Sequence, residues 1–176
     1  MRVTISKGGT LGSVPNKTLE ELNSYLKSKV VIIGMGNRLR GDDGVGSILA
    51  SRIKNKVGFD VFDVGISPEN YLEKIIQAKP DTIVIIDAAD FSGLPGEFKV
   101  LKAQDIKTCN FFATHNASIS LTINYLQNNL KVDIMALLIQ PKTIIFGEIL
   151  SPEVTGAISR LEDWFYEASK DKECRM

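Results

Sequence analysis

The sequence predicts an α/β fold with three layers, in which an open, twisted, mostly parallel sheet has helices on both faces. Two observations lead to this prediction. Short runs of apolar, largely β-branched residues recur along the chain, and such runs are typical of strands buried on both faces. Between them lie segments whose apolar residues return every three or four positions, as on one face of a helix. Strands that alternate with helices in this way are typical of parallel sheets.

The first predicted elements follow a loose segment rich in glycine and serine. Leucines at helical spacing predict a helix at 18–28, and the β-branched run VVII predicts a buried strand at 30–33. Apolar residues spaced as in a helix then cover 45–53. The segment VGFDVFDV predicts a second strand at 57–64.

The middle of the chain carries the clearest strand. The order Ser-Pro-Glu at 67–69 is typical of a helix start, because serine caps helices, proline suits the first helical position and an acid suits the first turn. We therefore expect a helix at 67–78. The run TIVIIDAAD predicts a strand at 82–90, and GEFKVL predicts a weaker strand at 96–101.

The last part of the chain repeats the same alternation. Apolar residues at helical spacing predict a helix after Asn116, and the run DIMALLI predicts another buried strand at 133–139. A second Ser-Pro-Glu at 151–153 predicts the start of the final helix, whose apolar stripe continues to Ala168.

The length of 176 residues is that of one domain. We expect an N-terminal extension with a short helix at 1–29, a single α/β catalytic domain at 30–170 and a charged tail at 171–176. Basic and acidic residues balance at 21 each, so no net field favours nucleic acid or an anionic membrane. No apolar run approaches membrane-spanning length, the N-terminus lacks a signal-peptide core, and Cys109 and Cys174 form no disulfide framework. The expectation is a cytoplasmic protein without membrane insertion.

The glycine-rich loop GMGNRLRGDDGVG, at 34–46, directly follows the first buried strand. A dinucleotide fingerprint needs a third glycine where Leu39 stands, and a phosphate-binding P-loop needs lysine and a hydroxyl where Asp42 and Asp43 stand. Carboxylates would repel phosphate by roughly 4 kcal/mol per unit pair at a surface site. A third interpretation is a sharp turn that presents one carboxylate, while Asp42 caps the following helix or supports the loop.

Two further polar residues follow apolar runs. Asp87 ends TIVII and should emerge at the carboxyl end of its strand, where ligands bind in such folds, although it could also start a turn. Asp90 is expected to be a turn residue. His115 is the one histidine in the sequence, and it could be a structural residue or a functional one. Asp43, Asp87 and His115 could converge to bind zinc, nickel or iron, or to act in general acid–base catalysis without a metal.

Several segments, in the right order, resemble the hydrogenase maturation endopeptidases. These are the loop GMGNRLRGDDGVG, SPEN after Asp63, the strand IVIIDAAD, TH in ATHNAS, and IQP, FGE and LSPEV near the end. The resemblance covers about 30–164, and the last segments are most similar to the hydrogenase-3-like branch. It implies an endopeptidase that removes a C-terminal extension from the large-subunit precursor of a nickel–iron hydrogenase after nickel insertion.

The resemblance also implies a site. The family's metal-contacting and catalytic residues match Asp43, Asp87 and His115, and a further family aspartate near the cleft matches Asp63. The matched supporting residues in the opening loop are Gly34, Gly36, Asn37 and Asp42. The nickel is carried by the substrate, so no tightly bound cofactor of the protease's own is expected. The family further implies a monomer that pairs transiently with the precursor, and the balanced charge predicts no nucleic-acid partner.

A receiver-type phosphoacceptor domain that binds Mg²⁺ is the alternative from another class. Such a domain also has an acidic pair after its first strand and a phosphorylatable aspartate after its third, here Asp87. The glycine loop, the order Pro141-Lys142 and a histidine at 115 oppose it. A small α/β binding protein without catalysis is a third possibility.

Overall fold

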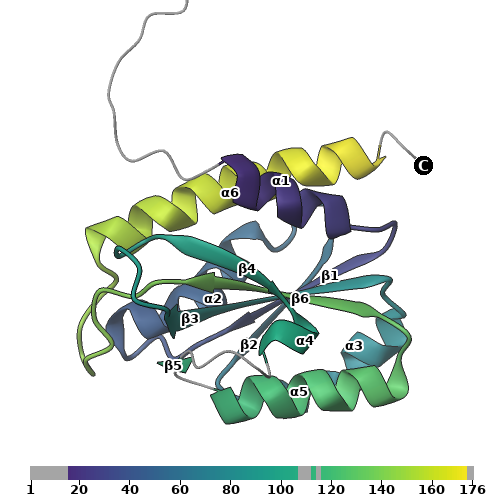
Figure 1. The fold of residues 1–176 in the computed structure, drawn as a ribbon, viewed down its shortest axis with the longest axis horizontal. Coiled ribbons are helices and arrows are strands. Elements are labelled where there is room, and N and C mark those ends of the chain that lie inside the picture. Colours follow the sequence, from purple (N-terminus) through teal and green to yellow (C-terminus); the bar gives the residue numbers. More distant parts are fainter. Residues whose placement is uncertain (1–15, 107–111, 114–115, 174–176) are drawn as a thin grey trace, which may run out of the picture.

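The computed structural model of the chain describes residues 16–106, 112–113 and 116–173, and Figure 1 shows its fold. The strands are β1 (Val30–Met35), β2 (Asp60–Gly65), β3 (Thr82–Asp90), β4 (Phe98–Lys102), β5 (Phe112–Ala113) and β6 (Asp133–Ile139). The α-helices are α1 (Asn16–Tyr25), α2 (Val45–Ile53), α3 (Leu72–Ala78), α4 (Ala103–Ile106), α5 (Asn116–Asn129) and α6 (Pro152–Glu173). Short 3₁₀ turns, η1 (Gly41–Gly44) and η2 (Pro68–Asn70), precede α2 and α3.

The sheet is open and mostly parallel, in the order β2-β1-β3-β6-β4. Strands β2, β1, β3 and β6 are parallel, with Ile33 opposite Ile85 and Ile85 opposite Ala136. Strand β4 is the antiparallel edge, and β5 pairs antiparallel with the end of β3. The predicted fold class is therefore confirmed. Parallel strands end at one edge of the sheet, so the loops after β1, β2, β3 and β6 gather there.

Side chains along each central strand alternate between two hydrophobic cores. On β1, Ile32 packs into the core under α1, α2 and α6, whereas Ile33 packs into the core under α3 and α5. Figure 1 shows α1 and α6 over one face and α3, α4 and α5 over the other. Burying a side chain of this size contributes roughly 1.5–3 kcal/mol. Burial on both faces explains why the central strands are continuous apolar runs.

The helix of the N-terminal extension belongs to the folded body. Leu22 and Leu26 of α1 lie in the same core as α2 and α6. The Thr82 hydroxyl donates to the carbonyl of Tyr25 over 3.0 Å and accepts from the N–H of Lys27 over 3.1 Å. The proposed division at residue 30 stays a prediction, but α1 is fixed to the start of β3.

The two Ser-Pro-Glu segments differ in the structure. Ser151 caps α6, because the N–H of Val154 donates to its hydroxyl over 3.3 Å. The Ser67 cap was wrong: its side chain makes no capping hydrogen bond, and η2 precedes α3. Pro68 favours a turn here. In the 3₁₀ turn the N–H groups of Asn70 and Tyr71 donate to backbone carbonyls, so they need no side-chain cap.

Helix α6 is the longest helix and continues to Glu173, beyond the expected end of the catalytic domain. One side of it is buried through Val154, Ile158, Leu161 and Phe165. Its other side carries charged residues, as a surface helix requires. In the described part of the chain, no helix is long and apolar enough to cross a membrane.

Candidate active site

The loop between β1 and α2 brings the helix start directly onto the ends of two strands. A Cβ atom at Gly46 would lie 2.1 Å from the carbonyl oxygen of Ile86 and 2.4 Å from that of Met35. A Cβ atom at Gly34 would lie 2.2 Å from the carbonyl oxygen of Gly46. Only glycine permits such an approach. The glycine rhythm of the sequence therefore reflects close packing of the α2 start on β1 and β3.

The same loop fixes the position of Asp43. Gly36 has φ +135° and donates its N–H to the carbonyl of Gly65 over 2.9 Å, which joins this loop to the end of β2. The side-chain oxygen of Asn37 accepts from the N–H of Leu39 over 3.0 Å, so the loop turns. The N–H of Asn37 then donates to the Asp43 carboxylate over 3.3 Å. Asp43 lies in η1 and is only 2% exposed.

Asp42 has a different environment from its neighbour. Its fully buried carboxylate accepts from the N–H and hydroxyl of Ser151 over 2.7 and 2.9 Å, and from the N–H groups of Lys142 and Thr143 over 2.8 and 3.2 Å. It makes no capping bond at the start of η1 or α2, so the capping interpretation was wrong. Asp42 instead holds the β6–α6 loop, residues 140–151, against the glycine loop.

Asp63, near the end of β2, forms a polar cluster with Arg38 of the glycine loop and Ser47 of α2. Its carboxylate pairs with the guanidinium of Arg38 over 2.6 Å and accepts from the hydroxyl of Ser47 over 2.7 Å. Arg38 Nε also donates to that hydroxyl over 2.7 Å. The N–H of Gly65 donates to Asp63 over 3.3 Å, and Gly65 has φ +54°. The cluster fixes the chain as it leaves β2.

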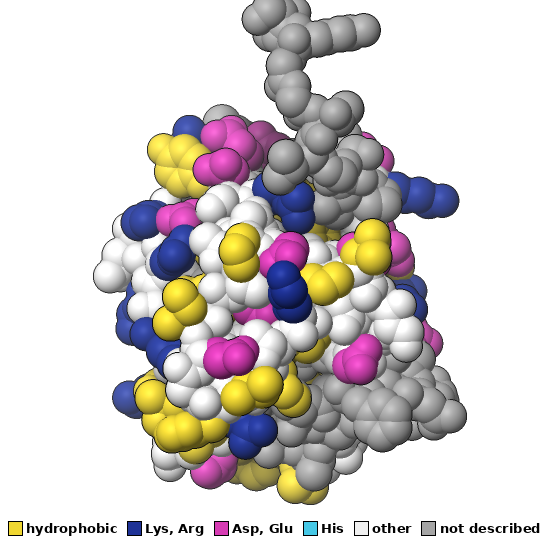
Figure 2. Space-filling model, turned by 90° about the vertical axis from the view of Figure 1, so that its left-hand side faces the viewer, with side chains coloured by type: hydrophobic (Ala, Val, Ile, Leu, Met, Phe, Trp, Pro, Cys, Tyr) yellow, Lys and Arg dark blue, Asp and Glu magenta, His cyan; other side chains and the backbone are white. Residues whose placement is uncertain are grey.

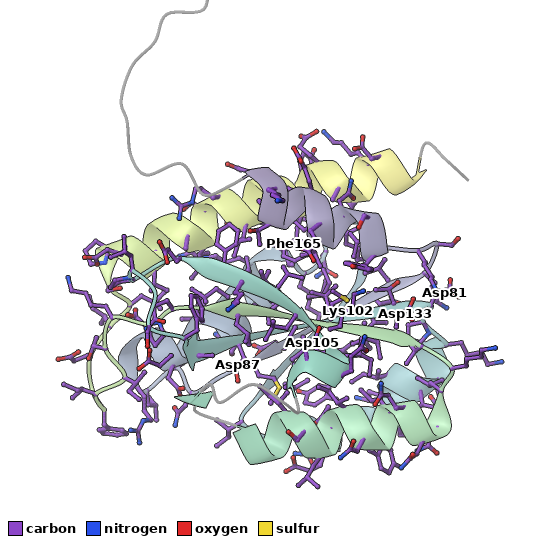
Figure 3. The ribbon with its side chains drawn as sticks, in the orientation of Figure 1. Asp81, Asp87, Lys102, Asp105, Asp133 and Phe165 are labelled. Atoms are coloured by element: carbon purple, nitrogen blue, oxygen red, sulfur yellow. The ribbon has the colours of Figure 1, made fainter. Side chains whose placement is uncertain are left out.

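Asp87 lies on the central strand and is completely buried. Strand β3 continues past it to Asp90, so the expectation that Asp87 emerges at the strand end was wrong. Its carboxylate accepts from the N–H of Ala88 over 2.9 Å. It follows the alternation of Ile83 and Ile85, which face α3 and α5, and Figure 3 shows it on the α5 side near the carboxyl end of β3.

Asp90 is the turn residue that the sequence predicts. It is exposed, and its carboxylate accepts from the N–H of Ser92 over 2.9 Å and from the amide of Gln140 over 3.1 Å. The Ser92 hydrogen bond lowers the pKa of Asp90 below its ordinary value of 3.8. Nearby, the hydrogen bond between Lys142 and Glu153, 2.8 Å long, raises the pKa of the lysine and lowers that of the glutamate. These exposed groups are charged at neutral pH and form a polar rim.

The structure places Asp43, Asp63 and Asp87 at one edge of the sheet, after β1, near the end of β2 and near the end of β3. The turn that carries Asp43 contacts β3. His115 lies outside the described residues, so its approach to the two buried aspartates stays a prediction. Within residues 16–106, 112–113 and 116–173, no three His, Cys, Asp or Glu side chains are grouped so that they could hold a metal ion.

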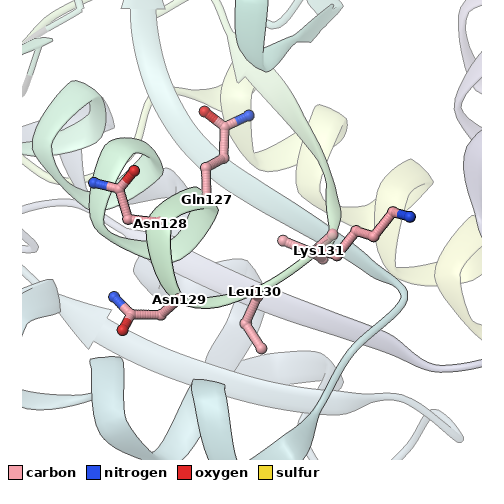
Figure 4. A pocket seen from close by; sticks show the side chains of 6 residues that line it. Gln127, Asn128, Asn129, Leu130 and Lys131 are labelled. Atoms are coloured by element: carbon pink, nitrogen blue, oxygen red, sulfur yellow. The ribbon is translucent and has the colours of Figure 1, made fainter.

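A shallow groove of about 400 Å³ lies beside these residues. The Arg38–Asp63 cluster lines it together with Gly36, Ile66 and Tyr71. Another depression, of about 490 Å³, lies between α5 and β6, where the strands begin (Figure 4). Amide, aliphatic and lysine side chains line the second depression, and carboxylates, imidazoles and thiols are absent from its lining. Of these two hollows, only the groove at the carboxyl edge has a carboxylate, that of Asp63, in its lining.

Sequence reasoning missed three residues that organise this edge. Arg38 and Ser47 lie in or beside the glycine loop, but nothing in their spacing indicates a bond to Asp63. Gln140 was also missed. It is a polar residue directly after the buried run DIMALLI, and the same pattern, a polar residue after an apolar run, identified Asp87. The side-chain oxygen of Gln140 accepts from the N–H groups of Phe91 and Gly93 over 2.9 and 3.1 Å. Gln140 thereby joins the loops after β3 and β6.

Comparisons with known proteins identify the family. The family model described as "Hydrogenase maturation protease" matches residues 44–167. The hydrogenase 3 maturation protease of Escherichia coli K12 is 33% identical over 143 residues, which cover 76% of this chain and 89% of that protein.

Solved structures agree with the sequence comparisons. A crystal structure of the [NiFe] hydrogenase maturation protease HycI from Thermococcus kodakarensis KOD1 has a TM-score of 0.75 at 28% identity, over 85% of this chain and 99% of that one. The solution structure of the endopeptidase HycI from Escherichia coli has a TM-score of 0.70 at 28% identity, over 79% and 90%. The receiver alternative is therefore wrong, as the antiparallel edge strand β4 also indicates. The chain belongs to the hydrogenase maturation protease family and is an endopeptidase of the HycI type.

Proposed function

We propose that this endopeptidase removes a C-terminal extension from the large-subunit precursor of a nickel–iron hydrogenase after nickel has been inserted. Membership of the family supports a hydrogenase precursor as the partner. The nickel belongs to the substrate, and the protease needs no tightly bound metal of its own. Asp43, Asp87 and His115 contact that nickel centre and position the nearby peptide bond.

The observation that carries this proposal is the burial of two carboxylates at the carboxyl edge. Asp43 is 2% exposed and Asp87 is completely buried, one after β1 and the other on the neighbouring strand β3. Burying carboxylates is costly, so a protein keeps them where a function or a partner requires them. In open α/β sheets, ligands bind beyond the carboxyl ends of the strands, so buried carboxylates at this edge support a functional site.

The same physics supports nickel gating. A divalent cation attracts buried carboxylates and offsets the cost of their desolvation. Carboxylate oxygens and an imidazole nitrogen are ligands that nickel accepts. A precursor loaded with nickel therefore gains binding free energy at this edge that the empty precursor lacks. Peptide hydrolysis also needs a general base within reach of the attacking water, and Asp43 and Asp87 are candidates for it.

The substitution Asp87→Asn tests the proposed site, because it removes the charge while almost keeping the shape. Processing of nickel-loaded precursor, followed by the mass of the large subunit, should fall at least about 100-fold, a typical loss for a catalytic group. Asp90→Asn is the matched control on the same strand. Asp90 is exposed, and its carboxylate accepts a hydrogen bond from the N–H of Ser92 in a turn. It should process the precursor at the wild-type rate.

Two outcomes decide the test once circular dichroism has shown that both variants are folded. Loss of processing in Asp87→Asn alone supports the site. Processing by Asp87→Asn at the wild-type rate would remove Asp87 from the mechanism.

The remaining features of the proposal concern how the protein works in the cell. We place the reaction in the cytoplasm, with the protease acting as a monomer that binds the precursor transiently. We keep 30–170 as the proposed catalytic domain, with the extension at 1–29, whose helix α1 packs on it, and the tail at 171–176, into which α6 continues. Basic and acidic residues balance at 21 each, which supports recognition of the precursor by shape and local chemistry.

A further inference from the structure

Large hydrophobic side chains are exposed where the glycine loop meets the β6–α6 loop. We call Leu39, Ile145, Phe146 and Ile149 the apolar tip; their exposed fractions are 63%, 62%, 71% and 87%. Figure 2 looks onto this side of the molecule and shows hydrophobic side chains between acidic and basic ones. Single exposed hydrophobic residues are ordinary, but a group of them on neighbouring loops is typical of an interaction surface.

Hydrogen bonds hold the apolar tip in one shape. The N–H of Glu148 donates to the carbonyl of Ile145 over 3.3 Å, which closes a β-turn with Phe146 and Gly147 in its centre. Gly147 has φ +84°, as the third residue of a type II turn requires. The N–H of Gly147 donates to the carbonyl of Leu39 over 2.8 Å, so the two loops are tied together at the tip itself.

The base of the apolar tip is anchored at the candidate active site. Asp42, which precedes Asp43 in η1, accepts four hydrogen bonds from the β6–α6 loop. Its own N–H donates to the carbonyl of Thr143 over 2.9 Å. The Thr143 hydroxyl donates to the Glu148 carboxylate over 2.6 Å, which braces the loop across the turn. The turn that carries Asp43 and the loop that carries the tip therefore form one rigid unit.

We propose that the apolar tip is a docking surface for the hydrogenase large-subunit precursor. This inference rests on the proposed function, because an endopeptidase that acts on a folded subunit must place that subunit against the edge that holds Asp43. The tip is continuous with that edge, so a protein seated on the site also covers the tip. A rigid apolar surface loses little conformational entropy on binding, which makes it effective for docking. The complementary surface on the precursor is apolar.

The test combines two substitutions that leave the buried bonds of the loop in place. Phe146→Ser with Ile149→Ser removes apolar area from the two most exposed tip residues. With nickel-loaded precursor as substrate, KM should rise at least about tenfold while kcat stays within about twofold, as expected for loss of hot-spot contacts that do not touch the reacting bond. Tyr125→Ser on α5, where Tyr125 is 46% exposed, is the matched control and should leave both constants unchanged.

Direct binding provides a second measurement without cleavage. In an Asp87→Asn background, the dissociation constant for the precursor should rise at least about tenfold when the two tip substitutions are added. Thermal unfolding checks that each variant is folded.

The outcomes separate the two proposals. If the wild type does not cleave the precursor, the proposed function fails. If it cleaves and the tip variant has the wild-type KM and dissociation constant, the docking surface is overturned while the proposed function stands. If sedimentation shows a wild-type dimer that the tip substitutions convert to monomer, the tip joins two copies of this chain and the docking proposal is likewise overturned.

Discussion

Asp42 and Asp43 are neighbours in sequence but differ in what they contact. Asp42 binds the β6–α6 loop through backbone N–H groups and the Ser151 hydroxyl, whereas Asp43 accepts from Asn37 within its own loop. The sequence predicted that one acid supports the structure and the other serves the site. It could not predict how Asp42 does so, because its partners lie about a hundred residues further along the chain.

Replacing Asp42 with asparagine should destabilise the fold. The amide keeps one acceptor oxygen but turns an N–H₂ group towards N–H donors of Lys142 or Ser151. Buried donors without an acceptor are costly, so the free energy of unfolding should fall by roughly 2–4 kcal/mol. Urea denaturation followed by circular dichroism measures this change. Asp60→Asn, at an exposed position on β2, is the control and should change stability by less than about 0.5 kcal/mol.

An Asp42→Asn variant as stable as Asp60→Asn would show that these hydrogen bonds contribute little. It would also weaken the argument that the apolar tip is rigid.

For the other site residues, sequence reasoning located positions better than contacts. An acid that ends an apolar run, such as Asp87, can be assigned to the carboxyl edge of a parallel sheet from the pattern alone. Its complete burial could not be predicted, because this depends on what packs over the sheet. The bond between Arg38 and Asp63 joins side chains from two loops, and single-sequence patterns carry no signal for such a pairing.

At the scale of elements, strands buried on both faces were the most predictable. The expected ranges 82–90 and 133–139 agree with β3 and β6. A short, continuous run of apolar residues is typical of a strand that is buried on both faces. The short elements α4 and β5 were not predicted. Each has too few residues for a periodic pattern, and β5 is defined by its pairing with the end of β3.

Two glycines with different surroundings predict opposite effects of substitution by alanine. Gly46 lies at the contact between α2 and the strand ends, whereas Gly156 lies on an open side of α6. Gly46→Ala places a Cβ atom 2.1 Å from the carbonyl oxygen of Ile86, so the helix start must move away from β1 and β3. The free energy of unfolding should fall by roughly 3 kcal/mol, and processing should fall with it because η1 moves too. Gly156→Ala in α6 meets nothing within 4 Å and should raise stability by about 0.5–1 kcal/mol.

Chemical denaturation of both variants measures the two effects under the same conditions. If Gly46→Ala were as stable as the wild type, close packing of α2 on the strand ends would not explain why glycine occupies position 46.

At the scale of the whole molecule, the fold assembles one working edge. The parallel order β2-β1-β3-β6 brings the ends of four strands together. Asp63 and Asp87 lie near the ends of β2 and β3, and the loops after β1 and β6 carry Asp43 and the apolar tip. The opposite edge has a depression lined by amide, aliphatic and lysine side chains. A large protein substrate is consistent with this arrangement, because the acidic site and the docking surface lie on the same side.

The central claim is that a metal centre in the substrate licenses cleavage at this edge. The most direct measurement is the mass of purified hydrogenase large-subunit precursor after incubation with this protein, in matched nickel-loaded and nickel-free preparations. The account predicts loss of a C-terminal peptide from the nickel-loaded precursor and an unchanged mass for the nickel-free one. Equal cleavage of both preparations would contradict nickel gating, and an unchanged mass in both would contradict processing of this precursor.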